Sequence, residues 1–223
     1  MMATMSPAIP AAGRRRTPST DIERELVGAA EEVLVRDGPA GVTVRAVAAQ
    51  AGIAPMGVYN RLGGKDGLVD ALLIRGFDML RAAVAGGSEP DLLDRLWACG
   101  LRYREFALAN RHFYAIMFEA AIPHEFSSEE VAAHAAAAFD ALVQNVDLAA
   151  AAGQVQVADP REAAQQIWST VHGAVALEMK DLILTPDPEA TYRATLAMVL
   201  RGLAPATRPG PRKDADGPDE RGR

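Results

Sequence analysis

The sequence predicts an all-α protein of about nine helices. Alanine is abundant, aromatic residues make up only 5% of the chain, and runs of β-branched residues are scarce, which favours helix over sheet. Apolar residues recur at helical spacing through most of the chain, and breaks rich in glycine and proline separate the segments. With 223 residues, the chain is long enough for one large domain or two small ones.

Composition narrows the class of protein further. A single cysteine excludes a disulfide scaffold and a cysteine-based zinc site. No apolar run approaches the ~20 residues of a membrane span, and the first residues lack a signal-peptide pattern, so we expect a soluble cytoplasmic protein with no membrane partner. Residues 1–84 hold 10 Lys/Arg against 9 Asp/Glu, whereas residues 85–223 hold 13 against 20. The acidic whole argues against bulk non-specific nucleic-acid binding, but not against a small binding head on an acidic body.

The first helix begins at Ser19-Thr20-Asp21, where Thr20 and Glu23 have the spacing of a capping box. It ends at Gly38-Pro39, because this pair interrupts helical geometry. Thr43 is a good N-cap for a second helix over 44–50.

Two further helices follow in the first part of the chain. Ala51-Gly52-Ile53 predicts a tight turn, and Pro55 suits the first turn of a helix over 55–61. After the Gly63-Gly64 break, a longer helix spans 65–84.

Five more helices and two tails complete the predicted chain. The helices span 91–109, 111–118, 128–152, 160–182 and 187–202. The ends, 1–19 and 205–223, are rich in proline, glycine and charge and are expected to be disordered. The domains expected are therefore a basic N-terminal arm over 1–19, a head over 20–67, a larger helical domain over 68–204 and a C-terminal tail over 205–223.

The two short helices and the turn between them form a predicted helix-turn-helix. One face of this pair is apolar and needs the helices before and after it as supports; its members are Val44, Val47, Ala48, Ile53, Val58 and Leu62. This pattern alone fits a plain helical hairpin as well as a DNA-binding unit.

Several features in a fixed order remove that ambiguity. They are Gly38, Thr43-Val44-Arg45-Ala46-Val47-Ala48, Ala51-Gly52-Ile53, Val58-Tyr59-Asn60-Arg61-Leu62 and Lys65-Asp66-Gly67-Leu68. Together they resemble the DNA-binding domain of the tetracycline-repressor (TetR) family of bacterial transcription regulators, over residues 21–75. The chain departs from that pattern at two positions. The family usually has an aromatic residue where this chain has Leu62, and a polar helix cap where this chain has Gly64.

The resemblance implies a homodimeric regulator, most simply a repressor, that binds double-stranded DNA at a near-palindromic operator. It implies phosphate contacts from Lys65, Tyr59 and Thr43, although Thr43 serves equally well as a helix cap only. Base contacts fall to Arg45, Met56 and Asn60, with apolar contact from Pro55. Arg14 to Arg16 form either a minor-groove arm or an undirected basic tail.

The second half resembles one class of TetR-family C-terminal domains, named for its Trp, His and Gly. The resemblance rests on Trp168, His172 and Gly173 and on the segment from Asn110 to Glu119. It implies release of DNA by a small apolar or amphipathic effector, with no cofactor. Expected pocket residues are Phe106, Phe113, Met117, Phe118, Phe139, Trp168, His172 and Met179, each of which also fits a plain helical core.

The last two long helices are expected to form the dimer interface as a four-helix arrangement. Their predicted apolar faces are Ile167, Val171, Ala174 and Val175 on one helix and Ala194, Leu196, Ala197, Val199 and Leu200 on the other. Cys99 is expected to be a small buried apolar residue.

An enzyme is the competing class, and the sequence argues against it. No H-E-x-x-H, Gly-x-Ser-x-Gly or phosphate-binding glycine loop is present. His124-Glu125 and the Glu130/His134 pair are the only hints of a metal site, and pairs of this kind are common on helix surfaces.

Overall fold

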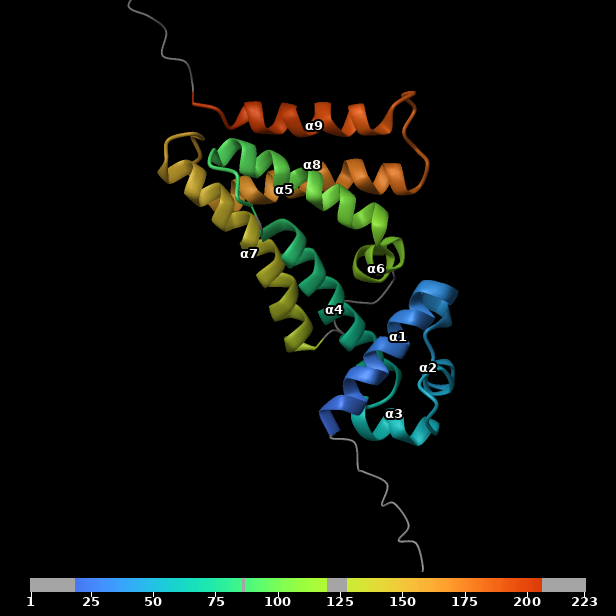
Figure 1. The fold of residues 1–223 in the computed structure, drawn as a ribbon. Coiled ribbons are helices and arrows are strands. Elements are labelled where there is room, and N and C mark those ends of the chain that lie inside the picture. Colours follow the sequence, from blue (N-terminus) through green and yellow to red (C-terminus); the bar gives the residue numbers. More distant parts are fainter. Residues whose placement is uncertain (1–18, 86, 120–127, 206–223) are drawn as a thin grey trace, which may run out of the picture. The chain divides into compact units, whose positions relative to one another are not determined.

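The computed structural model describes residues 19–85, 87–119 and 128–205, and within these ranges every regular element is helical (Figure 1). The all-α prediction is therefore confirmed. The elements are α1 Ser19–Gly41, α2 Val44–Gln50, α3 Pro55–Leu62, α4 Lys65–Ala85, α5 Leu92–Ala109, α6 Arg111–Tyr114, the π-helical turn η1 Ala115–Glu119, α7 Glu129–Ala151, α8 Pro160–Met179 and α9 Pro188–Gly202. Arg14 to Arg16, His124, Glu125 and the tail beyond residue 205 lie outside the described residues.

The chain divides into two compact units. Of the described residues, the first comprises 19–75, 112–119 and 128–131, and the second comprises 76–85, 87–111 and 132–205. The division falls inside α4 and not at the expected boundary after residue 67, because Leu68 and Leu72 are fully buried and belong to the core of the first unit. Residues 112–119 and 128–131 also join the first unit, although the sequence placed them in the larger domain.

The first unit is a three-helix head closed by the start of α4. α1 contributes a continuous buried stripe, Leu26, Ala29, Ala30, Val33 and Leu34. The helix-turn-helix buries Val47, Ala48 and Val58 against it, as its apolar face predicts, while Ile53 and Leu62 are only half-buried. Burying side chains of this size supplies about 1.5–3 kcal/mol each, so the short helices are held by packing on α1 rather than by their own helical propensity.

Helices of the head begin or end at capping and breaking residues that the sequence predicts. The Thr43 hydroxyl accepts a hydrogen bond from the backbone N–H of Ala46 at 3.2 Å, which caps α2. Gly63 ends α3 in the left-handed conformation, with φ 72°, and its N–H donates to the carbonyl of Tyr59 at 3.1 Å. Gly38 breaks α1 at φ 72°, as predicted, but a further helical turn carries this element on to Gly41.

In the second unit, α5 packs against both α8 and α9, which also pack against each other (Figure 1). Gly100 lets α9 approach closely, since a Cβ at this position would lie 2.7 Å from Leu196. The buried Tyr192 hydroxyl donates to the Gly100 carbonyl at 2.6 Å. Arg104 on α5 donates two hydrogen bonds to Glu178 on α8, at 2.8 and 2.6 Å. These contacts hold α5, α8 and α9 together as one packed group.

This packing corrects the predicted apolar faces of the last two helices. Five of their residues are buried within a single chain, namely Ile167, Val171, Val175, Leu196 and Leu200. They face α5 and each other, so they are not free to contact a second copy. The large apolar side chains that these helices expose are Leu177, 47% exposed, and Met198, 60% exposed.

Candidate functional site

The outward face of α3 carries the side chains predicted to contact DNA. Met56 is 64% exposed and Tyr59 is 54% exposed, and Pro55 and Asn60 are exposed as well. Val58, on the opposite face, is completely buried. Residues 56, 59 and 60 have the i, i+3, i+4 spacing of neighbours on one helix face, so they form a continuous surface that we call the α3 face.

The joint between α3 and α4 positions two of these groups. The ring of Tyr59 lies against the backbone of Gly64, where a Cβ would be 2.9 Å from the ring carbon Cε1. A Cβ on Gly67 would overlap the carbonyl oxygen of Leu62, so only glycine permits this close approach of the two helices. Lys65 is the first residue of α4 and is exposed. The departure from the family pattern at Gly64 therefore creates the space that the Tyr59 ring occupies.

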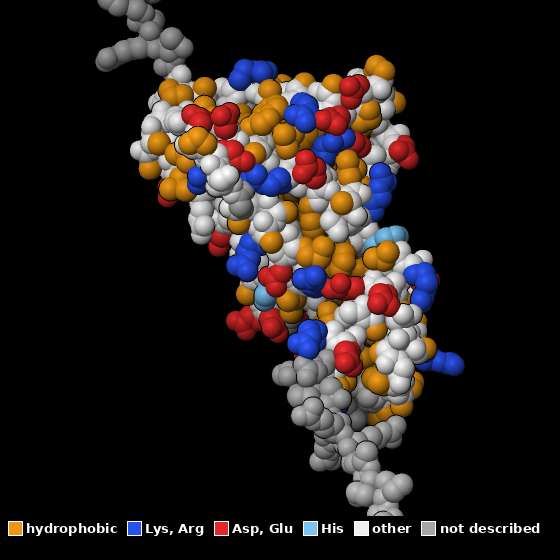
Figure 2. Space-filling model, viewed as in Figure 1, with side chains coloured by type: hydrophobic (Ala, Val, Ile, Leu, Met, Phe, Trp, Pro, Cys, Tyr) orange, Lys and Arg blue, Asp and Glu red, His pale blue; other side chains and the backbone are white. Residues whose placement is uncertain are grey.

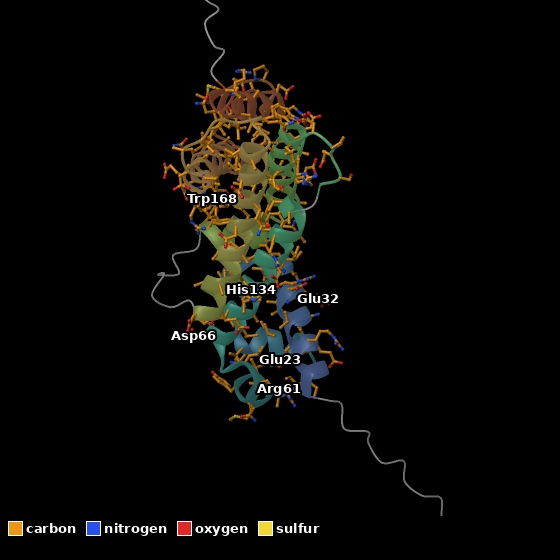
Figure 3. The ribbon with its side chains drawn as sticks, turned by 90° about the vertical axis from the view of Figure 1, so that its left-hand side faces the viewer. Glu23, Glu32, Arg61, Asp66, His134 and Trp168 are labelled. Carbon is orange, nitrogen blue, oxygen red and sulfur yellow. The ribbon has the colours of Figure 1, made fainter. Side chains whose placement is uncertain are left out.

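Charge is distributed unevenly over the head. Between Asp37 and Asp66 the sequence contains no acidic residue, and its cations are Arg45 and Arg61 together with Lys65. The acidic residues before this stretch lie on α1, as Figure 3 shows for Glu23 and Glu32, and Asp66 follows it in the first turn of α4, whereas Arg61 lies on α3. A helix-turn-helix without acidic side chains presents a locally positive surface on an otherwise acidic chain.

Polar contacts join α1 to the end of α2. Arg36 donates to the Gln50 side-chain oxygen at 2.8 Å, and the Gln50 amide in turn donates to Glu32. Glu31 accepts from Arg75 on α4 at 2.8 Å. Two of the α1 carboxylates are therefore engaged within the head, which leaves the α2–α3 surface to its cations.

A row of rings crosses the second unit. The ring centroids of Phe139 and Trp168 are 6.0 Å apart, and those of Trp168 and His172 are 5.5 Å apart. The Tyr103 hydroxyl and His172 Nδ1 share a hydrogen bond of 2.8 Å, and the Arg161 guanidinium lies 5.2 Å from the centroid of the Phe139 ring. Three predicted effector residues are thus brought together in an aromatic row with polar groups.

Tyr103 is the member of this row that sequence reasoning missed. It lies 69 residues from His172, and no spacing rule connects the two. A tyrosine at helical spacing in α5 is predicted only to be a buried core residue, and Tyr103 is indeed 5% exposed.

The other predicted effector residues are distributed over both units. Phe106 is buried and Met179 is half-buried in the second unit. Phe113, Met117 and Phe118 belong to the segment that joins the first unit. Their part in effector binding stays a prediction.

A cavity of about 370 Å³ opens between α4 and α7, and it is lined by Arg81, Ala82, Ala85, Ala137, Asp140, Ala141 and Gln144. None of the predicted effector residues lines it. Acidic, basic and histidine side chains mix at the surface over these two helices (Figure 2).

The Glu130/His134 pair is accounted for by a different partner. His134 Nδ1 lies 2.8 Å from an Asp78 carboxylate oxygen, which links α7 to α4. Across the part of the chain that the structure describes, no group of three or more His, Cys, Asp or Glu side chains is placed to hold a metal ion.

The helix-turn-helix with its exposed α3 face defines the class of DNA-binding transcription regulators, and comparisons identify the family. Residues 26–72 match the model of bacterial regulatory proteins of the tetR family, and residues 96–199 match the model described as "Tetracyclin repressor-like, C-terminal domain". The chain belongs to the TetR family. Trp168, His172 and Gly173 lie within the second match, consistent with the C-terminal class named for these residues.

Solved structures agree with this assignment. A protein with unknown function from Rhodococcus sp. RHA1 is 29% identical, with a TM-score of 0.74, and the alignment covers 82% of this chain and 96% of that one. A tetR-family regulatory protein from Rhodococcus RHA1 is 20% identical, with a TM-score of 0.61 and coverage of 83% and 98%. NalD of Pseudomonas aeruginosa, a repressor of a multidrug efflux pump, is 21% identical, with a TM-score of 0.60 and coverage of 83% and 97%. At these lower identities the likeness concerns the fold alone.

No relative among curated proteins matches the sequence. Among the described residues, no helix is both long and apolar enough to cross a membrane.

Proposed function

We propose that this TetR-family regulator is a repressor that binds a near-palindromic operator as a homodimer and is released by a small apolar or amphipathic molecule. The observation that carries the proposal is the α3 face, which is exposed while Val47, Ala48 and Val58 of the helix-turn-helix are buried. In this account α3 lies in the major groove of double-stranded DNA.

The residue types on this surface suit distinct contacts. Lys65 and Tyr59 contact phosphates, and Lys65 does so in the first turn of a helix, where free N–H groups already favour an anion. Arg45 pairs with a guanine edge and Asn60 with an adenine edge, while Met56 and Pro55 meet thymine methyl groups. Because few polar side chains are available to read bases, DNA shape contributes much of the specificity.

Lys65 provides the test of the phosphate contacts. Fluorescence anisotropy of a labelled duplex from the DNA upstream of the chain's own gene, titrated across salt concentrations, measures the contacts. Lys65→Ala lowers the salt slope by about 1. Lys180→Ala, at an exposed lysine in the second unit, leaves the slope unchanged and is the matched control. Failure to bind any duplex at low salt, or an unchanged slope in Lys65→Ala, would contradict the proposal.

The homodimer is proposed to form through the outer surfaces of α8 and α9. Gly173 and Leu177 lie four residues apart on α8, and Ala194 and Met198 lie four apart on α9, and all are exposed. No side chain lies within 4 Å of a Cβ built on Gly173, so a second helix can approach there. Two such pairs across a two-fold axis make a four-helix interface.

The aromatic row of the second unit is the proposed effector site. It combines apolar ring faces with the Tyr103–His172 hydrogen bond, the mixture that small-molecule sites use. Trp168 reports binding through its fluorescence. A molecule that releases DNA without changing this emission, and that still binds Trp168→Ala unchanged, would place the effector elsewhere.

A further inference from the structure

Two arginines on α5 converge on one glutamate outside the aromatic row. Arg95 and Arg102 are seven residues apart, with Cys99 between them, so the three share a helix face. Arg102 Nη1 donates to the Glu89 carboxylate oxygen Oε1 at 3.1 Å. Arg95 Nη2 donates to the backbone carbonyl of Glu89 at 3.2 Å. We call these three residues the Arg95–Arg102–Glu89 cluster.

The cluster holds more hydrogen-bond donors than its own carboxylate satisfies. Within the described ranges, Nε of Arg95 and both Nε and Nη2 of Arg102 are buried atoms without a hydrogen-bond partner. The second carboxylate oxygen of Glu89, Oε2, is likewise buried and has no hydrogen-bond partner. Buried polar groups are almost always paired in proteins, and unpaired charged donors are especially costly. Three such donors in one cluster, beside one unpaired acceptor, therefore indicate a site that binds something further.

The charge and the exposure of the cluster indicate which kind of ligand it would bind. Two guanidiniums and one carboxylate leave one net positive charge. The pKa of Glu89 is held below its usual range by its own backbone N–H and by Arg102, so its carboxylate is ionised at neutral pH. The side chains of Arg102 and Glu89 are 26% and 29% exposed, so the cluster borders solvent although its unpaired atoms are buried.

The groups on the inner side of the cluster are uncharged. Cys99 is 3% exposed and lies beside Arg102 and Asn145, and burial raises the pKa of its thiol to about 11, so it stays neutral. Asn145 is buried too, with its amide directed at the Val84 carbonyl at 3.5 Å. An anion held here would carry its non-polar part against uncharged groups.

We propose that Arg95 and Arg102 form a binding site for a small molecule with one carboxylate and an uncharged body, whose carboxylate accepts from the N–H groups that Glu89 leaves unpaired. Planar guanidiniums match a carboxylate through paired N–H groups. A single carboxylate neutralises the net charge of the cluster, whereas a phosphate dianion would overshoot it. Any effect of this binding on DNA rests on the proposed function, but the binding itself does not.

Binding is measured on the full chain as the shift of the thermal unfolding midpoint with ligand concentration. The probes are hexanoate and benzoate, with hexanamide and inorganic phosphate as comparisons. At least one carboxylate stabilises the wild type, and hexanamide does not. Arg95→Met and Arg102→Met weaken binding about tenfold, because each removes charge-assisted hydrogen bonds. Arg193→Met, at an exposed arginine on α9, binds like wild type.

Glu89→Gln keeps the inference testable even where an arginine variant fails to fold. It removes the competing carboxylate and therefore tightens carboxylate binding severalfold. The inference is overturned by binding of neither carboxylate, by equal binding in all variants, by loss of binding in Glu89→Gln, or by phosphate binding more tightly than both carboxylates. None of these results affects DNA binding, and failure of DNA binding would leave the carboxylate site intact.

Discussion

At the scale of single residues, neighbouring side chains of α3 differ sharply in exposure. Val58 is completely buried, whereas Met56 and Tyr59 are more than half exposed. This division was predictable, because apolar periodicity identifies the buried face of a helix and leaves the opposite face for contacts. The partners of Tyr103 and Arg102 were not predictable, since hydrogen bonds between distant elements depend on tertiary packing and not on local spacing.

Cys99 gives a prediction at this scale. Burial raises the pKa of its thiol from 9.0 to about 11, so native Cys99 is almost entirely in the unreactive thiol form. Alkylation by iodoacetamide near pH 8 is therefore much slower in the native chain than in urea. Because the folded state has the raised pKa, Cys99 costs no stability below the unfolded pKa of 9.0, and stability falls as pH rises from there through about 11. Equal labelling rates with and without urea would contradict this.

At the scale of elements, helix ends were more predictable than helix partners. The ends of α2 and α3 follow from Thr43 and Gly63, whose capping geometry is local. The apolar stripes of α8 and α9 showed that these faces would be buried, but not against what. α5 covers them within one chain, so the surface left for a second copy is different from the predicted one.

The joint between α3 and α4 gives a prediction for these elements. Gly67→Ala places a Cβ on the Leu62 carbonyl oxygen and costs about 1–3 kcal/mol of unfolding free energy through overpacking. Gly28→Ala, in α1, has nothing within 4 Å of its Cβ and should gain about 0.5–1 kcal/mol instead. Urea denaturation of both variants measures the difference, and a neutral Gly67→Ala would show that the close approach does not exist.

At the scale of the whole molecule, the family match and the division into two units agree that a DNA-binding head is joined to a helical domain with its own core. The sequence predicted this organisation but drew the boundary after residue 67. It could not locate the division inside α4, because one continuous helix serves both cores and no composition change marks the transition.

Oligomeric state is the prediction that belongs to this scale. Met198→Glu places a charge on the exposed surface of α9 and shifts the wild-type dimer toward monomer, as measured by sedimentation velocity. Leu148→Glu changes a comparably exposed apolar side chain on α7, 47% exposed against 60%, and leaves the dimer intact. A monomeric wild type, or equal effects of both substitutions, would contradict the proposed interface.

The most direct test of the account is site-specific photocrosslinking to DNA. A photoreactive residue is placed at Met56 on the α3 face or at Val35 on α1, two apolar positions of similar exposure, 64% and 58%. The account predicts that position 56 crosslinks to a labelled duplex from the upstream region and that position 35 does not. Crosslinking from position 35 alone, or from neither position while the duplex is bound, would show that α3 does not lie against the DNA.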